Sequence, residues 1–380
     1  MSGRLSLIVA ALPAFAYFFN VGSIGFWLPL YAKELGWSYT EITLLATGYF
    51  IAVTIATPLA GAASDLTRRP GLVLALGMAV VSLTSIAMTL PRDPPSLIAL
   101  RSLQGFGLAV GIPVALGSLS LMAGVRRGVS ITAASSGLGM AVGAGVSGML
   151  AEVLGFKPIF YLAAVVAGLA SISALAWNPP VPPRERGFLE ALRSVPPEVL
   201  VVMAALFVRN FFASGVFSVL AIIFNVIVGV GYLATGVALA VNPSVQTMVS
   251  LAAPAIVRGA AAASYSLGIA GTGLVFTLYL SATSLQDLIA AQVLQGFFYA
   301  VTVVSGNTLI VSLSPRDVRY TASSLYNLAF NAGWIAGTVA AGPIMDSLGV
   351  EAWVEAASLG VALSSLIPLV LLRSQRARAV

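Results

Sequence analysis

The 380-residue chain has no cysteine and no histidine, and only 8% of its residues are charged. Without cysteine it has no disulfide, no thiolate metal site and no cysteine nucleophile. Without histidine it has no imidazole base and no imidazole metal ligand. Soluble proteins carry about 25% charged residues, whereas here 59% of the residues are hydrophobic. The sequence therefore predicts an integral membrane protein.

What the chain does have is a series of long apolar stretches. A helix needs roughly 20 mostly apolar residues to span a bilayer, and twelve stretches of that kind follow one another with short links. We expect them at 6–32, 41–64, 71–90, 96–123, 129–153, 158–178, 199–227, 231–256, 260–282, 288–313, 320–346 and 351–372.

One proline-rich segment interrupts this series. Residues 179–198 contain three proline pairs, which stop one helix and delay the next. Between the pairs an apolar face lies opposite a charged one, which predicts a short amphipathic helix at the inner membrane surface. We therefore expect a six-helix bundle over 1–178, a cytoplasmic linker over 179–198 and a second six-helix bundle over 199–380.

The net charge of +6 reflects 19 basic and 13 acidic residues. In an apolar chain, basic residues mark membrane topology more often than a nucleic-acid partner. If the N-terminus lies in the cytoplasm, fourteen of the basic residues fall inside, three fall outside and two lie within helices. This split follows the positive-inside rule and predicts that both termini are cytoplasmic.

The two halves of the sequence contain near-copies of the same segments. Residues 97–110 read LIALRSLQGFGLAV and residues 288–301 read LIAAQVLQGFFYAV, identical at nine of 14 positions with an offset of 191. At a similar offset, Glu152-Val-Leu-Gly matches Asp346-Ser-Leu-Gly. These matches indicate a duplicated six-helix unit. Two copies with the same orientation are typical of transporters that bind substrate between the halves, near the midplane.

Two motifs carry a family resemblance. The loop after the second predicted helix reads Gly61-Ala-Ala-Ser-Asp65-Leu-Thr-Arg68-Arg69, and the fourth helix contains Arg101-Ser-Leu-Gln104-Gly105. Here, and over essentially the whole chain, the sequence resembles the major facilitator superfamily. The resemblance implies an all-α membrane fold of twelve helices, in two bundles related by pseudo-twofold symmetry, that transports solutes by rocker-switch alternating access. The loop departs from the family pattern because the glycine expected before the arginines is missing.

The resemblance also implies roles for the loop and for a glycine series. Gly61, Asp65, Arg68 and Arg69 would form a conformational latch, in which Asp65 pairs with a helix N-terminus or an arginine of the other half; the arginines could instead only mark topology. In the fifth helix, Gly139, Gly143, Gly145 and Gly148 resemble a glycine-rich motif of antiporters. Small residues spaced by four also let membrane helices pack closely, and we favour packing.

Two arginines lie within the predicted helices, Arg101 near the outer end of the fourth and Arg209 near mid-depth in the seventh. An ionised side chain there costs at least a few kcal/mol, so each is a functional hypothesis. A guanidinium binds carboxylate or phosphate through two parallel hydrogen bonds, and no acidic residue lies at mid-depth. Arg101 could alternatively bond helix-1 carbonyls or serve coupling. The expected substrate-binding residues are Asn20, Arg101, Arg209, Asn210, Tyr299, Asn307, Asn327 and Asn331.

We therefore expect a secondary transporter of a small organic solute, in particular an anion. The alternative is an exporter of lipophilic, drug-like compounds, which an aromatic-walled cavity would suit. For cationic drugs a buried carboxylate would be expected, and none is evident. Energy coupling stays open: Glu152, Asp346 or Glu355 would serve proton coupling if they face the cavity, and exchange or passive facilitation fits equally well.

Other classes of protein fit less well. An enzyme would need a nucleophile with a base, a metal site or a carboxylate pair, and such a site cannot be assembled convincingly from these residues. We expect no enzymatic activity, no cofactor, no metal and no nucleic-acid partner. The expected partners are a small-molecule substrate and the lipid bilayer, for a monomer in a prokaryotic cell membrane. A channel would differ by its higher turnover and its lack of counterflow.

Overall fold

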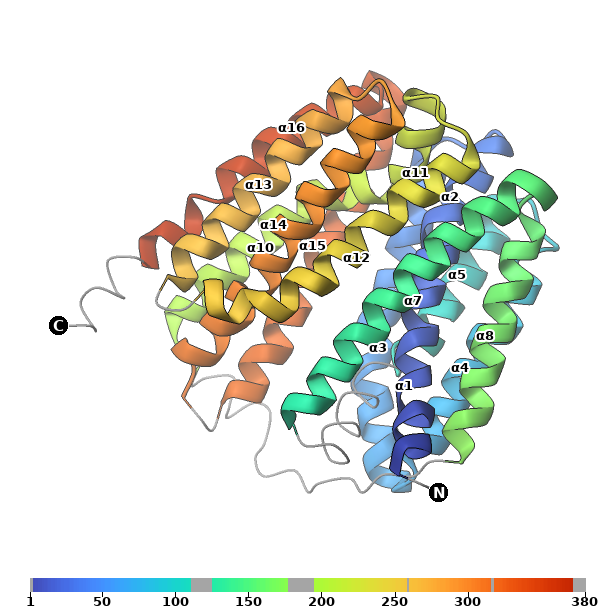
Figure 1. Cartoon of the computed structure of the whole chain (residues 1–380), viewed down its shortest axis with the longest axis horizontal. Coiled ribbons are helices and arrows are strands. Elements are labelled where there is room, and N and C mark those ends of the chain that lie inside the picture. The colour runs from blue at the N-terminus through green and yellow to red at the C-terminus, as the bar shows by residue number, and fades with distance from the viewer. Residues whose placement is uncertain (1–2, 111–124, 177–194, 258–259, 316–317, 372–380) are drawn as a thin grey trace. The chain divides into compact units, whose positions relative to one another are not determined.

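The computed structural model describes residues 3–110, 125–176, 195–257, 260–315 and 318–371. Every regular element within these ranges is a helix (Figure 1). The predicted amphipathic helix in the linker falls largely on residues outside the described ranges.

The first half of the chain contributes six long helical stretches. The first combines α1 (Gly3–Asn20), the π-helix η1 (Val21–Gly25) and α2 (Phe26–Glu34) in one continuous path. The others are α3 (Tyr39–Thr67), α4 (Pro70–Ala87), α5 (Pro94–Leu108), α7 (Val125–Leu154) and α8 (Lys157–Leu175).

The second half contributes six more. The first combines α10 (Pro197–Ser218), α11 (Leu220–Ile222) and the π-helix η2 (Ile223–Ile227). It is followed by α12 (Tyr232–Ile256), α13 (Ala261–Ser281), α14 (Leu285–Leu313) and α15 (Arg319–Leu348). The last stretch is α16 (Val350–Ser364) with the 3-10 helix η3 (Ile367–Val370).

These stretches confirm the helices predicted from the sequence. Ten of the described helical stretches are long and apolar enough to cross a membrane. The two predicted spans that are not among them are α5 and α12. The described part of α5 has only 15 residues, because residues 111–124 of the predicted helix lie outside the described ranges. The helix α12 has 25 residues and occupies the predicted range 231–256.

Local sequence fixes where the helices begin. Ser38 opens α3 with a capping box, in which its hydroxyl accepts from the Glu41 backbone and the Glu41 carboxylate accepts from the Ser38 backbone at 2.9 Å. Asp93 caps α5 by accepting from the Ser96 backbone nitrogen at 3.0 Å. Hydrogen bonds from the Ser96 side chain and backbone lower the pKa of the exposed Asp93 carboxyl.

Duplicated glycines fix where two of the helices end. Gly155 follows α7 with φ of 79°, and Gly349 follows α15 with φ of 90°. Residues with a side chain rarely adopt this backbone region, so glycine is favoured at both ends. These are the glycines of the repeated segments Glu152-Val-Leu-Gly and Asp346-Ser-Leu-Gly, so the repeat recurs as a shared helix-ending turn.

The chain divides into two compact units. One consists of Met1–Pro182 and Ser218–Thr247, the other of Pro183–Phe217 and Met248–Val380. In the first unit α1 packs against α7 and α8, α4 against α5 and α8, and α3 against α5. In the second unit α13 packs against α14 and α16, and α15 against α14 and α16.

The helix α7 packs through glycines on two faces. A Cβ atom on Gly139 or Gly143 would overlap a backbone carbonyl oxygen of α1, at Phe15 and Phe19 respectively. On the other face, a Cβ atom on Gly148 would lie 2.8 Å from the Cα atom of Gly236 in α12. The glycine series therefore serves close helix packing, as small residues do in membranes.

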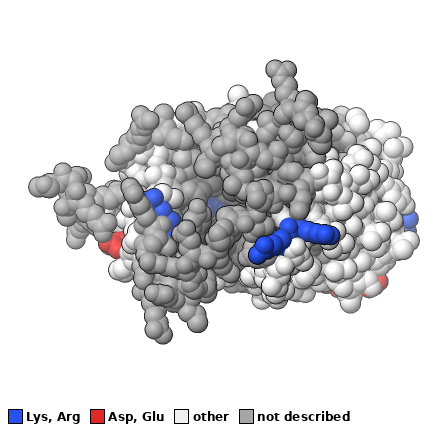
Figure 2. Space-filling view, turned by 90° about the horizontal axis from the view of Figure 1, so that it is seen from below, with Lys and Arg blue, Asp and Glu red and all other residues white. Residues whose placement is uncertain are grey.

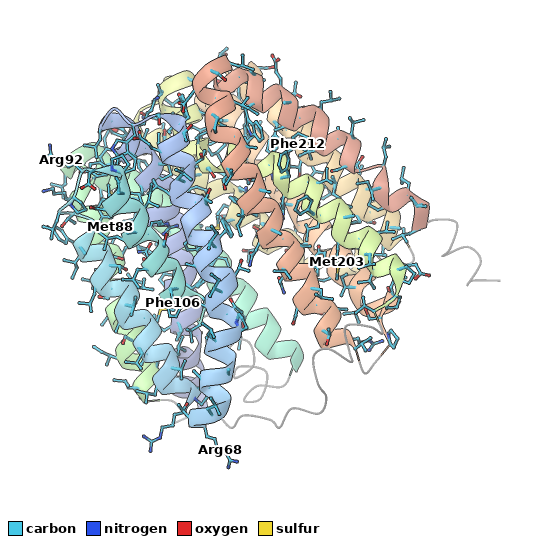
Figure 3. All side chains as sticks on the ribbon, turned by 180° about the vertical axis from the view of Figure 1, so that it is seen from behind. Arg68, Met88, Arg92, Phe106, Met203 and Phe212 are labelled. Carbon is cyan, nitrogen blue, oxygen red and sulfur yellow. The ribbon has the colours of Figure 1, made fainter. Side chains whose placement is uncertain are left out.

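Much of the described surface is apolar. Large hydrophobic side chains are exposed along the helices, among them Leu83, Ile172 and Leu359, each more than 60% exposed. The face seen in Figure 2 is mostly uncharged where it is described, with few basic or acidic side chains. Figure 3 shows Arg68 and Arg92 near opposite ends of the first unit. Such a surface suits a lipid environment.

Candidate functional site

Two charged side chains are buried among the described residues, Arg101 in the first unit and Arg209 in the second. Their exposed fractions are 6% and 1%. No carboxylate with a described side chain is buried to the same extent. Since burying an unpaired charge is costly, these two guanidiniums are the strongest candidates for function.

Arg209 lies in α10, and its neighbour Asn210 holds one of its nitrogens. Arg209 Nη1 donates to Asn210 Oδ1 at 2.7 Å, and Asn210 Nδ2 donates to the Phe330 carbonyl of α15 at 3.4 Å. The fully buried Asn210 is therefore anchored on α15 while it orients the guanidinium. A Cβ atom on Gly333 would lie 2.9 Å from Asn210 Cβ, so the absent side chain lets α10 approach α15.

The other two nitrogens of the same guanidinium have no partner. Arg209 Nε and Nη2 are buried and make no hydrogen bond. Two aromatic rings lie close to the guanidinium, whose Cζ atom is 5.1 Å from the Tyr299 ring centre and 5.8 Å from that of Phe217. Cation–π attraction to such rings offsets part of the burial cost but supplies no acceptor.

Two further tyrosines lie near Arg209. Tyr265 of α13 is fully buried, its hydroxyl donates to the Val202 carbonyl at 3.3 Å, and its side chain is hydrogen-bonded to that of Tyr326 of α15. A Cβ atom on Gly306 would lie 2.9 Å from the Tyr265 ring. We name Phe217, Tyr265, Tyr299 and Tyr326 the aromatic collar of Arg209. Of these four residues, Tyr299 was predicted from the sequence to bind substrate, whereas Tyr265 and Phe217 were not.

Arg101 is held in a polar network within the first unit. Its Nη1 donates to Gln104 Oε1, and Gln104 Nε2 donates to Ser85 Oγ of α4 at 2.9 Å. The Arg101 Cζ atom lies 4.4 Å from the Tyr49 ring centre, and the Tyr49 and Tyr17 hydroxyls are 3.1 Å apart. The predicted motif residues Arg101 and Gln104 are thus in direct contact. Gly105 lets α5 approach α3, since its Cβ would lie 2.8 Å from the Tyr49 carbonyl.

The predicted amides occupy varied positions. Asn20 is fully buried, donates to the Ala16 carbonyl at 3.0 Å and leaves its Oδ1 without a partner, just before the π-helix η1. Asn307 and Asn327 are exposed, and Asn327 donates to the Ser323 carbonyl at 3.0 Å. Asn331 is partly buried. Among the contacts given above, Asn210 is the amide that is hydrogen-bonded to Arg209. The role of the other amides in binding remains a prediction.

The predicted coupling carboxylates are all exposed. Glu152 lies near the end of α7 and accepts from the Leu233 backbone nitrogen at 3.2 Å, in the first turn of α12. The Tyr232 hydroxyl in the same turn donates to Glu34. Two carboxylates therefore converge where α12 begins, a position that favours negative charge. Asp346 is exposed in the last turn of α15, and Glu355 is exposed in the second turn of α16.

The predicted latch loop is described in part. Gly61 is exposed within α3, which continues to Thr67, and Arg68 and Arg69 are exposed between α3 and α4. Arg68 adopts the left-handed conformation with φ of 51°, at the position where the family pattern has a glycine nearby. The side chain of Asp65 lies outside the described part of the structure.

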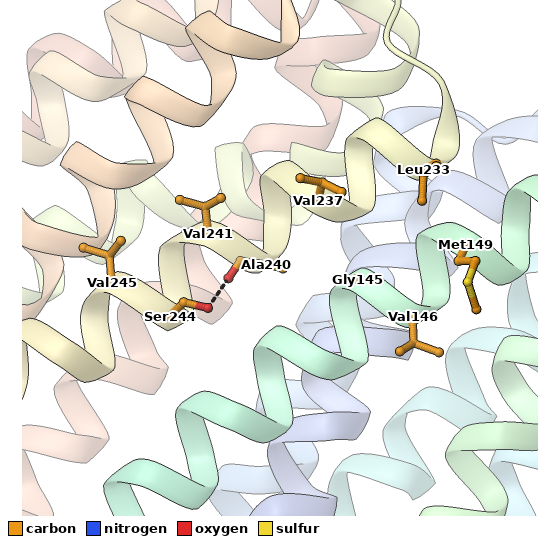
Figure 4. A pocket seen from close by; sticks show the side chains of 9 residues that line it. All are labelled: Gly145, Val146, Met149, Leu233, Val237, Ala240, Val241, Ser244 and Val245. Carbon is orange, nitrogen blue, oxygen red and sulfur yellow. Dashed lines mark hydrogen bonds between the residues drawn. The ribbon is translucent and has the colours of Figure 1, made fainter.

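A groove in the first unit has a different character from the two arginine sites. It lies between α7 and α12, with a volume of about 470 Å³, and Figure 4 shows its lining. Ser244 is the hydroxyl residue of that lining, and it donates to the Ala240 carbonyl at 2.8 Å. The groove therefore offers apolar contact and no group to bind an ion. Its lining residues are Gly145, Val146, Met149, Leu233, Val237, Ala240, Val241, Ser244 and Val245.

Comparisons with known proteins identify the family. The model of the Major Facilitator Superfamily matches residues 10–260 and again residues 251–379. The chain belongs to this family of membrane transporters. The crystal structure of the nucleoside transporter NupG superposes with a TM-score of 0.79 at 13% identity, covering 98% of this chain and 99% of that one. At this identity the likeness shows the shared fold.

Two curated relatives match part of the chain. Citrate exporter 1 of Aspergillus niger is 29% identical over 153 residues, which cover 39% of this chain and 29% of that protein. The multidrug resistance protein MdtG of Proteus mirabilis (strain HI4320) is 32% identical over 158 residues, covering 39% and 38%. The matches thus span well under half of these relatives' length.

Proposed function

We propose that this protein is a secondary transporter that moves a small organic anion across the membrane by rocker-switch alternating access. The observation that supports the proposal is the buried guanidinium of Arg209, which has two unpaired donors and an aromatic collar. A buried charge without a counter-ion is costly, and an anionic solute would supply that counter-ion. Citrate exporter 1, a relative over part of the chain, carries a name that refers to an anion.

The remaining predicted residues complete this proposal. Asn210 orients Arg209, and the amides Asn20, Asn307, Asn327 and Asn331 with Tyr299 would contact the rest of the solute. Arg101 would contribute a second binding or coupling charge. Gly61, Asp65, Arg68 and Arg69 would act as the latch, and Glu152, Asp346 and Glu355 are the candidates for proton coupling.

An exporter of lipophilic compounds is the second candidate function. The aromatic collar favours it, since rings also suit drug-like molecules, and MdtG is named as a multidrug resistance protein. The buried charges argue against cationic drugs, because both are guanidiniums. Neutral lipophilic compounds are therefore the substrates that this second function would require.

Counterflow in liposomes separates the two functions. The purified protein is reconstituted with a high internal concentration of one unlabelled solute, and uptake of the same labelled solute is followed. Aromatic and aliphatic monocarboxylates, citrate, a neutral lipophilic drug and a lipophilic cation make up the panel. We expect counterflow with at least one anion. Counterflow of neutral drugs or lipophilic cations, without any of the anions, would overturn the proposal.

The membrane orientation and the bundle boundaries are proposals as well. We place both termini in the cytoplasm of a prokaryotic cell and the six-helix bundles at 1–178 and 199–380, joined by the linker 179–198, in a monomer. Fusions of alkaline phosphatase and of green fluorescent protein to the C-terminus test the orientation. A fluorescent C-terminal fusion, with an inactive phosphatase, is the expected result.

A further inference from the structure

We propose that the free edge of Arg209 binds one carboxylate group side-on, and that the solute is a monocarboxylate with an apolar, preferably aromatic, body. This inference rests on the proposed function and narrows it, because the proposed function alone leaves open whether the anion is a carboxylate, a phosphate or a sulfonate. The three guanidinium nitrogens of Arg209 and the four rings of the aromatic collar support it.

One edge of the Arg209 guanidinium has no hydrogen-bond acceptor. Arg209 Nη1 is already used on Asn210 Oδ1 at 2.7 Å, whereas Nε and Nη2 have no acceptor. In a guanidinium, Nε and Nη2 lie on one edge, and their two N–H bonds point the same way. That pair matches the two oxygens of a carboxylate in a planar, bidentate arrangement. Asn210 therefore leaves open the edge best suited to a carboxylate.

The number of oxygens and negative charges that this edge can pair with favours a single carboxylate. The Nε–Nη2 edge presents two parallel N–H bonds, which satisfy two acceptor oxygens. A phosphonate or sulfonate head group is tetrahedral, so its third oxygen would lie off that edge, and the ring contacts of Arg209 given above offer it no second cation. A buried oxygen without a donor weakens binding by about 10- to 100-fold. A single guanidinium also neutralises one negative charge, so a second carboxylate on the solute would remain unpaired in the collar.

The aromatic collar favours an apolar body for the solute. The aromatic collar presents ring surfaces from three helices beyond α10, with Tyr299 on α14, Tyr265 on α13 and Tyr326 on α15. Two of its hydroxyls bond each other, and Tyr265 also bonds the Val202 carbonyl. The hydroxyl groups of Tyr265 and Tyr326 are thus already engaged, so these two residues offer mainly ring surface. An apolar or aromatic body fits such a surface.

The solute needs a path to the free edge of Arg209. Arg209 is 1% exposed, so its free edge is covered in this structure. Tyr299, the nearest ring, is only partly buried. We infer that the Tyr299 ring moves when the solute binds and then packs on it. Tyr299→Phe keeps the ring, whereas Tyr299→Ala removes it, so only the second variant should weaken binding.

The test compares head groups on one aromatic body, using the full-length wild-type protein in detergent. Dissociation constants are measured by calorimetry or thermal shift for benzoate, benzenesulfonate, phenylphosphonate, phthalate and benzamide. We expect benzoate to bind at least about tenfold more tightly than the sulfonate, the phosphonate or the dianion phthalate, and benzamide to bind least.

The matched variants are Arg209→Lys and Arg92→Lys. Lysine is a point charge that cannot offer two parallel donors, so Arg209→Lys should lose at least about tenfold in benzoate affinity. Arg92 is exposed, and its variant should behave as wild type. Equal benzoate affinity in Arg209→Lys, or tighter binding of phenylphosphonate than benzoate, would overturn this inference while anion transport could still stand. Counterflow of none of the anions would instead remove the proposed function.

Discussion

Arg209 and Asn210 are consecutive residues of α10, and their side chains are joined by a hydrogen bond of 2.7 Å. Asn210 also reaches the Phe330 carbonyl on α15. The amide thus couples the direction of the guanidinium to the packing of two helices. It engages Nη1 of Arg209 and leaves the Nε–Nη2 edge free.

This contact predicts the effect of Asn210→Asp. A carboxylate in place of the amide would pair with Arg209 and supply the counter-charge that the described surroundings lack. Buried charge pairs of this kind form strong hydrogen bonds. We expect the melting temperature to rise and anion affinity to fall by more than about tenfold, measured by thermal shift and by binding of benzoate. A variant that binds anions as well as the wild type would show that Asn210 does not control the charge of this site.

Glu152 gives a second prediction, about the start of α12. Its carboxylate accepts from the Leu233 backbone at 3.2 Å, a role that a glutamine oxygen can also fill. Glu152→Gln should therefore keep stability and counterflow, whereas Glu152→Ala should cost about 1 kcal/mol, as the loss of a helix cap does. Thermal unfolding of both variants measures the difference.

The same variant separates capping from proton coupling. If Glu152 carried the coupling proton, Glu152→Gln would keep counterflow but lose accumulation driven by a pH gradient. Loss of that accumulation with counterflow kept would assign the coupling proton to Glu152, whereas unchanged accumulation would leave Glu152 as a cap of α12 only.

The packing of α7 gives a third prediction. A methyl group on Gly143 would overlap the Phe19 carbonyl of α1. Overpacking of this kind typically costs about 1–3 kcal/mol, so Gly143→Ala should lower the melting temperature and the yield of folded protein. Gly61→Ala is the matched control, since nothing lies within 4 Å of its Cβ position. Equal losses of stability in the two variants would contradict the close α1–α7 contact.

Arg68 gives a fourth prediction. It is the non-glycine residue with positive φ in the described part of the chain. The left-handed conformation costs a residue with a side chain roughly 1–2 kcal/mol. Glycine would remove this strain, but it loses more backbone entropy on folding, which offsets part of the stabilisation. Arg68→Gly should therefore raise stability by up to about 1 kcal/mol. A drop in the melting temperature would mean that the arginine side chain makes a stabilising contact.

The helices were predictable because each depends on neighbours in sequence. Apolar stretches of about 20 residues, the Ser38–Glu41 capping box and the glycines at 155 and 349 set the beginnings and ends of elements locally. The two π-helices were not predicted. The apolar pattern does not distinguish their wider turns from an α-helix.

The candidate site was predictable only in part. A lone arginine in an apolar stretch is conspicuous, so Arg209 and Asn210 were expected. Tyr265 was missed because tyrosine is common in membrane helices, and only its approach from α13 reveals a role. The glycine series of α7 was expected to pack, but its division between α1 and α12 depends on tertiary contacts that one sequence does not contain.

The most direct test of the central claim is counterflow by Arg209→Gln in liposomes. Glutamine keeps hydrogen-bonding groups near the site but removes the positive charge, so an anion would lose its counter-ion. We expect transport of the best anionic solute to fall by about 100-fold or more, while Arg92→Gln transports as the wild type does. Unchanged transport of every anion by a folded Arg209→Gln protein would contradict the account.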